Sequence, residues 1–186
     1  MSGVAPQWLA LLRGINVGGN KKVPMAMLRG LSEGLGWTAV QSYIQSGNLV
    51  FRAKGKPATL AAALEQAIVA EFGFEVPVVV CSAAAWTGFA AGSPFADAAA
   101  ERPNLLHLAL AKVQVSAAAA KGLLPYCKAG ERVEVRDGAL WIDFVAGVAR
   151  SKLTPAVLDR MVGGTVTARN WRSVQALAAL LAEGNG

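Results

Sequence analysis

A loop that combines glycines with lysines is the feature of this sequence best suited to chemistry. It reads Arg13-Gly14-Ile15-Asn16-Val17-Gly18-Gly19-Asn20-Lys21-Lys22. Glycines let the backbone turn with its N–H groups exposed, and lysines add full positive charge, so the loop suits a phosphate or a carboxylate. It is not a Walker A motif, because Asn20 takes the place of the lysine and Lys22 that of the serine or threonine. A tight turn with solvated lysines is the alternative, and the sequence leaves both open.

A second basic cluster lies near the C-terminus. Arg150-Ser151-Lys152 precedes a predicted helix, and Thr167-Ala168-Arg169-Asn170-Trp171 leads into the last one. Arg169 offers a planar fork of donors, and Asn170 can cap the helix. With Trp171 as a stacking surface, the cluster suits a phosphate that carries an aromatic base. The alternatives are a core position for Trp171, which we favour, and an ion pair for Arg169, which stays open.

The candidate anion-binding residues of the two clusters are Arg13, Asn16, Gly18, Gly19, Lys21, Lys22, Arg150, Lys152, Arg169 and Asn170. The chain's single histidine, His107, lies within an apolar strand, and we expect it to be structural. No Cys/His set has the spacing of a metal site, and no nucleophile elbow is present. We therefore expect no metal and no cofactor, and the catalytic residues of any enzyme activity stay unknown.

A polar turn is predicted at Gln45-Ser46-Gly47-Asn48, between two short strands. We expect it to lie at the opposite end of the sheet from the loop of residues 13–22, which counts against one shared site. The strand that follows, Leu49-Val50-Phe51, lacks the spaced aromatic residues of the RNA-recognition motif.

The elements that position these residues follow a regular order in the first half. The pattern predicts strands at Trp8–Val17, Val40–Gln45, Leu49–Arg52 and Val76–Cys81, with helices at Pro24–Leu35 and Thr59–Phe72. The continuous apolar run of the first strand indicates burial on both faces. A β-α-β-β-α-β order is typical of the ferredoxin-like arrangement, a sheet with both helices on one face.

The same order recurs in the second half. We predict strands at Leu105–Ala111, Arg132–Arg136, Ala139–Phe144 and Val166–Ala168, and helices at Ser116–Leu124, Thr154–Val162 and Trp171–Glu183. Asp137-Gly138 is a strong hairpin signal. We therefore expect an α+β protein with two tandem ferredoxin-like halves, residues 1–82 and 104–186, and a C-terminal helix. The connector of residues 83–103 is rich in Ala, Gly and Pro and is predicted to hold a short helix at Ala84–Ala90.

Composition excludes several classes of protein. Of the 186 residues, 54% are hydrophobic and 16% charged, which excludes a disordered chain. The longest charge-free stretch, Val76 to Ala96, is interrupted by prolines and glycines and predicts no membrane span. Residues 1–7 lack the features of a signal peptide, so we expect a cytoplasmic protein with Cys81 and Cys127 as free thiols.

Four motifs taken together resemble a bacterial family catalogued as domain of unknown function 1697. They are Arg13-Gly14-Ile15-Asn16-Val17-Gly18-Gly19 with Val23-Pro24-Met25, then Tyr43-Ile44-Gln45-Ser46-Gly47-Asn48, Arg150-Ser151-Lys152-Leu153 and Thr167-Ala168-Arg169-Asn170-Trp171. The motifs span most of the chain in the family's order, with Ala168 and Ser173 where threonine is usual. The resemblance implies an α+β fold of two related ferredoxin-like halves, and it implies no catalytic residue.

The charge balance orders the functional hypotheses. A net charge of +6, with basic residues at polar loops and helix starts, favours a phosphate-bearing partner, either a small molecule or nucleic acid. The alternatives are an enzyme that acts on a small anionic, phosphorylated substrate and a structural or oligomerisation module. We expect no membrane partner. The ligand and the oligomeric state stay unknown from sequence.

Overall fold

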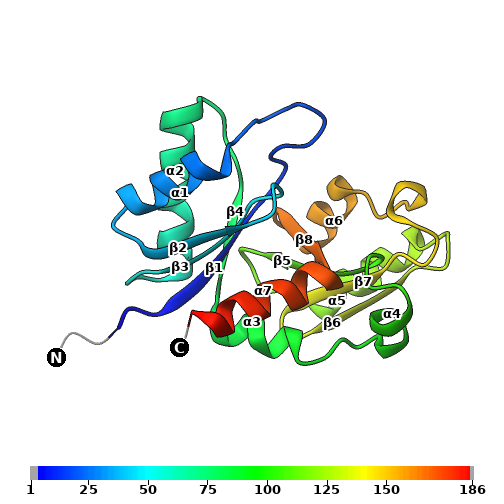
Figure 1. Ribbon diagram of the computed structural model, residues 1–186. Coiled ribbons are helices and arrows are strands. Elements are labelled where there is room, and N and C mark those ends of the chain that lie inside the picture. Colours follow the sequence, from blue (N-terminus) through cyan, green and yellow to red (C-terminus); the bar gives the residue numbers. More distant parts are fainter. Residues whose placement is uncertain (1–3, 185–186) are drawn as a thin grey trace. The chain divides into compact units, whose positions relative to one another are not determined.

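A computed structural model describes residues 4–184 of the chain. Within that range it contains eight β-strands and seven α-helices (Figure 1). The strands form two four-stranded sheets with antiparallel pairing throughout, which confirms the predicted α+β class. Two compact units can be separated: the residues up to Thr87 together with those from Leu177 onward, and Gly88–Ala176. Each unit is described by itself.

The first unit has the predicted β-α-β-β-α-β order. Its elements are β1 (Gln7–Leu12), α1 (Met25–Gly34), β2 (Thr38–Tyr43), β3 (Asn48–Arg52), α2 (Pro57–Phe72), β4 (Val78–Ser82) and the start of α3 (Ala83–Ala90). The strands are arranged β2-β3-β1-β4. Leu9 of β1 pairs with Val50 on one side and Cys81 on the other, so β1 lies in the middle of the sheet.

Strand β1 is shorter than predicted. Every residue of β1 is buried, as its apolar run indicates, but the strand ends at Leu12 and does not reach Val17. Gly14 and Asn16 have φ angles of 70° and 55°, in the left-handed region, where an extended strand cannot continue. The apolar residue Ile15 is nevertheless buried, because the loop folds back onto the first unit.

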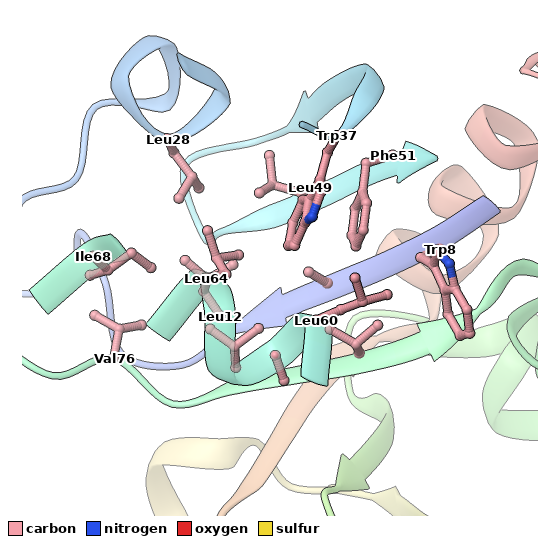
Figure 2. Packing of buried hydrophobic residues seen from close by; sticks show 14 of the residues in the cluster. Trp8, Leu12, Leu28, Trp37, Leu49, Phe51, Leu60, Leu64, Ile68 and Val76 are labelled. Atoms are coloured by element: carbon pink, nitrogen blue, oxygen red, sulfur yellow. The ribbon is translucent and has the colours of Figure 1, made fainter. Parts of the chain in front are cut away.

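The core of the first unit lies between the sheet and its two helices. Leu28 of α1 and Leu64 of α2 are fully buried against side chains of β1, β3 and β4 (Figure 2). The rings of Trp37 and Phe51 stack in parallel with their centroids 3.9 Å apart. Burying a side chain of this size stabilises the fold by roughly 1.5–3 kcal/mol. Both helices cover one face of this sheet (Figure 1).

The second unit begins within α3 and contains ten further or shared elements: α4 (Ala96–Glu101), β5 (Leu106–Ala111), α5 (Ala117–Leu123), the 3₁₀ turns η1 (Leu124–Tyr126) and η2 (Val148–Arg150), β6 (Arg132–Arg136), β7 (Ala139–Asp143), α6 (Pro155–Val162), β8 (Val166–Asn170) and the start of α7 (Trp171–Glu183). Its strands are arranged β6-β7-β5-β8. Ala119 of α5 and Leu158 of α6 belong to one core cluster with side chains of β5, β7 and β8.

The local signals of the second half are confirmed. Asp137 and Gly138 have φ angles of 53° and 75°, as the tight turn between β6 and β7 requires. Ser116 and Thr154 cap α5 and α6 through their side-chain oxygens. The connector contains the predicted helix as α3, but α4 was not predicted, since its alanine-rich sequence carries no clear start or stop. No helix of residues 4–184 is long and apolar enough to cross a membrane.

Candidate functional site

The glycine-rich loop is held in place by the side chain of Asn16. Its Nδ2 group donates to the carbonyl oxygens of Val23 (3.0 Å) and Gln45 (2.8 Å), and its Oδ1 accepts from the backbone N–H of Val23 (2.9 Å). Both amide hydrogens are therefore used within the protein. Asn16 lies in the left-handed region, which asparagine tolerates better than most residues.

The loop and the turn at residues 45–48 lie at the same end of the first sheet, so the expectation of opposite ends is wrong. Strands β1 and β2 are both antiparallel to β3, and they therefore run in the same direction and end at the same edge. The N–H of Leu12 donates to the carbonyl oxygen of Gly47 at 2.8 Å. A Cβ at Gly47 would lie 2.8 Å from the Cδ1 of Ile15, and the φ of Gly47 is 83°, so only glycine fits.

The tip of the loop is a tight turn. The N–H of Asn20 donates to the carbonyl oxygen of Val17 at 3.1 Å, and Gly18 and Gly19 between them have positive φ angles. The Nζ of Lys21 donates to the carbonyl oxygen of Glu75 at 2.6 Å, whereas Lys22 is exposed. Turn geometry accounts for both glycines, and of the two lysines it is Lys22 that projects into solvent.

Arg169 and Asn170 are placed by strand β8 and the start of α7. The side chain of Asn170 accepts from the N–H of Ser173 at 3.0 Å and caps α7, as predicted. Arg169 is only 9% exposed and donates to the carbonyl oxygen of Ala168 at 2.8 Å. Burial lowers the pKa of its guanidinium to about 10. Trp171 packs against Trp141, with ring centroids 5.7 Å apart, which agrees with the core position we favoured.

Lys152 lines an open groove on the second unit. The groove has a volume of about 520 Å³, and we call it the lysine groove; it is lined by Pro125, Tyr126, Lys128, Lys152, Thr154 and Val157. Within residues 4–184, neither the Lys128 nor the Lys152 ammonium group has an ion-pair or hydrogen-bond partner. Arg160 lies over the Tyr126 ring, 5.7 Å from its centroid, and donates to the Tyr126 hydroxyl at 2.6 Å. The groove thus combines positive charge with an apolar lining.

The lysine groove suits binding better than proton transfer. Two ammonium groups attract an anion, and the side chains of Pro125, Tyr126 and Val157 offer an apolar surface to the rest of a ligand. Of the lining residues in the described part of the chain, none is acidic and none is a histidine. Sequence reasoning identified Lys152 but missed Lys128 and Tyr126, because nothing in the sequence between α5 and β6 connects them to residues 150–152.

Arg150 precedes this groove and does not line it. It is exposed at the end of η2, and the neighbouring Ser151 donates from its hydroxyl to the Oε1 of Glu131 at 2.5 Å. The groove lining includes neither Arg169 nor Asn170. Lys152 is therefore the one predicted residue that the lining contains, among those that the structure describes.

A buried ion network at the edge of the second sheet was also missed. Asp143, at the end of β7, is completely buried and accepts from Arg102 (2.6 and 3.0 Å) and Arg132 (2.7 and 3.0 Å). Asp97 of α4 accepts from the same two arginines, and Arg132 lies over the Phe95 ring. Burial by itself would raise the pKa of Asp143, but the two guanidinium groups outweigh burial and lower it. The arginines are neutralised within the protein, so we assign the network a structural role.

His107 occupies a structural position, as predicted. Its Nδ1 lies 3.3 Å from the carbonyl oxygen of Leu105, and its ring meets that of Phe144 edge-on at 5.0 Å. Burial lowers its pKa. Among the described residues, no cluster of His, Cys, Asp and Glu side chains could hold a metal ion. Cys81 and Cys127 are free thiols.

Comparison with known proteins supports the family resemblance. A family model described as Protein of unknown function (DUF1697) matches residues 6–141. The solved structure of the conserved bacterial protein SP0830 from Streptococcus pneumoniae is similar, with a TM-score of 0.66 and 20% sequence identity, over 95% of this chain and 98% of that one. At this identity the likeness shows the fold alone. The chain has no match among curated proteins.

Proposed function

Because the chain belongs to the family described as Protein of unknown function (DUF1697), we propose a function from its own geometry: it binds a phosphate-bearing small molecule in the lysine groove. The observation that carries the proposal is the pair of ammonium groups, Lys128 and Lys152, that line one groove and have no partner among the described residues. An ammonium group left without an acidic partner at a concave surface is available to a negatively charged ligand.

The groove favours a small molecule over a nucleic acid. Its volume of about 520 Å³ falls in the range of small-molecule sites, which is roughly 300–1,000 Å³. The lysines supply charge for a phosphate, and Tyr126 with its apolar neighbours supplies a surface for an organic group. Nucleotides combine a phosphate with an aromatic base and therefore match both parts of the lining.

The proposal includes the origin of the site in one of two ferredoxin-like halves, residues 1–82 and 104–186, joined by residues 83–103. Both strand orders, β2-β3-β1-β4 and β6-β7-β5-β8, support it. A repeated contact supports it too: Glu65 of α2 accepts from the N–H of Val78, and Asp159 of α6 accepts from the N–H of Val166, in each case at the start of the last strand.

The groove itself belongs to the second half alone, in the segment between α5 and β6 and at the start of α6. We place the protein in the cytoplasm as part of the same proposal, and its two free thiols support a reducing compartment.

Titration calorimetry at low salt, with ADP and with inorganic pyrophosphate, tests the proposal. Lys128→Ala and Lys152→Ala should each weaken binding about tenfold, the effect of about 1.4 kcal/mol for a lost charged contact. Lys54→Ala, which removes an exposed lysine of the first unit, is the matched control and should change nothing. Added salt should weaken binding of both probes.

Two outcomes would overturn this assignment. Binding that survives both groove substitutions but is lost in Lys22→Ala would place the ligand at the glycine-rich loop. Binding of a DNA oligonucleotide in preference to ADP, with a steep salt dependence, would make nucleic acid the partner. No binding of any of the three probes at low salt would remove the phosphate-binding function altogether.

A further inference from the structure

We propose that Glu131 is a positioning residue that holds the two lysine-bearing segments of the groove together. This inference rests on the proposed function, since it concerns the same groove. Glu131 is 7% exposed, and each oxygen of its carboxylate is bonded to a different segment. Its Oε2 accepts from the N–H of Ala129 at 2.8 Å, and its Oε1 accepts from the hydroxyl of Ser151 at 2.5 Å. Ala129 directly follows Lys128, and Ser151 directly precedes Lys152.

The segment around Lys152 is fixed on both sides by Ser151. While its hydroxyl donates to Glu131, the same oxygen accepts from the N–H of Leu153 at 3.1 Å. Lys152 therefore lies within a short turn that one side chain closes and anchors. Leu153, the residue after it, is buried in the core of the second unit.

The segment around Lys128 is fixed in a corresponding way. The N–H of Lys128 donates to the carbonyl oxygen of Tyr126 at 2.9 Å, and the N–H of Ala129 donates to Glu131. Both lysines are thus attached to a backbone that one buried carboxylate links. Neither lysine is itself bonded to Glu131, so the carboxylate leaves their ammonium groups available to a ligand.

The bonds to Glu131 outweigh the cost of burying it. Burial by itself would raise the pKa of this carboxyl, but the hydrogen bonds from Ser151 and from backbone N–H groups lower it overall. Glu131 forms no ion pair within residues 4–184. A buried carboxylate that relies on neutral donors is sensitive to the loss of one of them, so Ser151 is the point at which the link can be tested.

A double-mutant cycle on ADP binding tests the role of Glu131 through Ser151. Ser151→Ala breaks the link to the Lys152 segment and leaves the link to Ala129, whereas Ser151→Thr keeps a hydroxyl. We expect Ser151→Ala to weaken ADP binding about tenfold and Ser151→Thr to retain affinity within about twofold. In a Lys152→Ala background, Ser151→Ala should cost nothing further, but in a Lys128→Ala background its cost should add in full.

Amide hydrogen exchange on the unliganded protein provides a readout that needs no ligand. In Ser151→Ala, the N–H of Leu153 should exchange faster while that of Ala129 keeps its protection. Thermal unfolding of each variant separates a local change from a general loss of stability.

The outcomes separate the two proposals. If Ser151→Ala and Lys152→Ala have additive effects on ADP binding, the lysines bind but Glu131 does not position them. If ADP binds and Lys152→Ala has no effect, the groove is not the site, and both proposals fail. If ADP does not bind to the wild-type protein, the proposed function fails and the positioning role with it, whatever the exchange rates show.

Discussion

The Nδ2 group of Asn16 lies 2.8 Å from the carbonyl oxygen of Gln45, 29 residues further along the chain. This hydrogen bond joins the glycine-rich loop after β1 to the turn after β2. The two segments meet because β1 and β2 run in the same direction on either side of β3. The same side chain also bonds to both backbone groups of Val23, just before α1. One asparagine therefore fixes the path of the loop.

Replacing Asn16 should destabilise the first unit. Asn16→Ala removes three hydrogen bonds and places alanine in a left-handed conformation, so we expect the free energy of unfolding to fall by about 2–4 kcal/mol. Urea denaturation followed by circular dichroism measures this change. Asn20→Ala, in the exposed tip of the same loop, is the control and should cost less than about 0.5 kcal/mol. Equal effects of the two substitutions would show that Asn16 has no special structural role.

Replacing Asp143 should have a larger effect. Asp143→Asn keeps the size of the side chain but leaves Arg102 and Arg132 without their buried acid, so unfolding should become easier by about 3–5 kcal/mol. Glu134→Gln, which breaks the exposed pair with Arg136, should change stability by less than about 1 kcal/mol. A stability of Asp143→Asn close to that of the wild type, measured by urea denaturation, would contradict this role of the network.

The same network should make the protein sensitive to acid. The Arg132 and Arg102 guanidinium groups lower the pKa of Asp97 to about 2, below the value near 3.8 of a free carboxyl. A group whose pKa is lower in the folded state contributes stability above its unfolded pKa and loses it as the pH falls toward its folded pKa. We therefore expect stability to fall between about pH 4 and pH 2.

Asp97→Asn provides the comparison for this pH dependence. The variant should already lack the Asp97 contribution at pH 5, and its unfolding free energy should fall less steeply between pH 4 and pH 2 than that of the wild type. Urea denaturation at a series of pH values gives both curves. Parallel curves would show that Asp97 does not contribute to the acid sensitivity.

His107 should produce a second, separate pH dependence. Burial lowers its pKa below the usual value near 6.5, so the unfolded chain binds a proton at a higher pH than the folded protein does. Stability should therefore fall as the pH drops below about 6.5, well above the range in which the carboxyls titrate. In His107→Phe, which keeps an aromatic ring against Phe144, the melting temperature should change less between pH 7.5 and pH 5. An unchanged slope would rule out His107 as its source.

Local sequence signals determined most of the elements. The Asp137-Gly138 turn, the Ser116 and Thr154 caps and the stop of α2 at Gly73 depend on the conformational preferences of single residues, and all four were predicted. The periodic burial of Leu60, Leu64 and Ile68 follows in the same way from helical spacing. Such signals act over a few residues and need no knowledge of the rest of the chain.

Only the tertiary structure decided which polar residues meet. Tyr126 and Lys128 join Lys152 in one groove because η1 packs beside the start of α6, and Asp143 meets Arg102 and Arg132 because β6, β7 and the connector converge at one sheet edge. Charge is visible in a sequence, but the distance between charges depends on long-range strand pairing and helix packing. For that reason the sequence by itself determined that this protein carries excess positive charge on polar loops, and the fold decided which of those charges Asp97, Asp143 and the loop carbonyls already occupy.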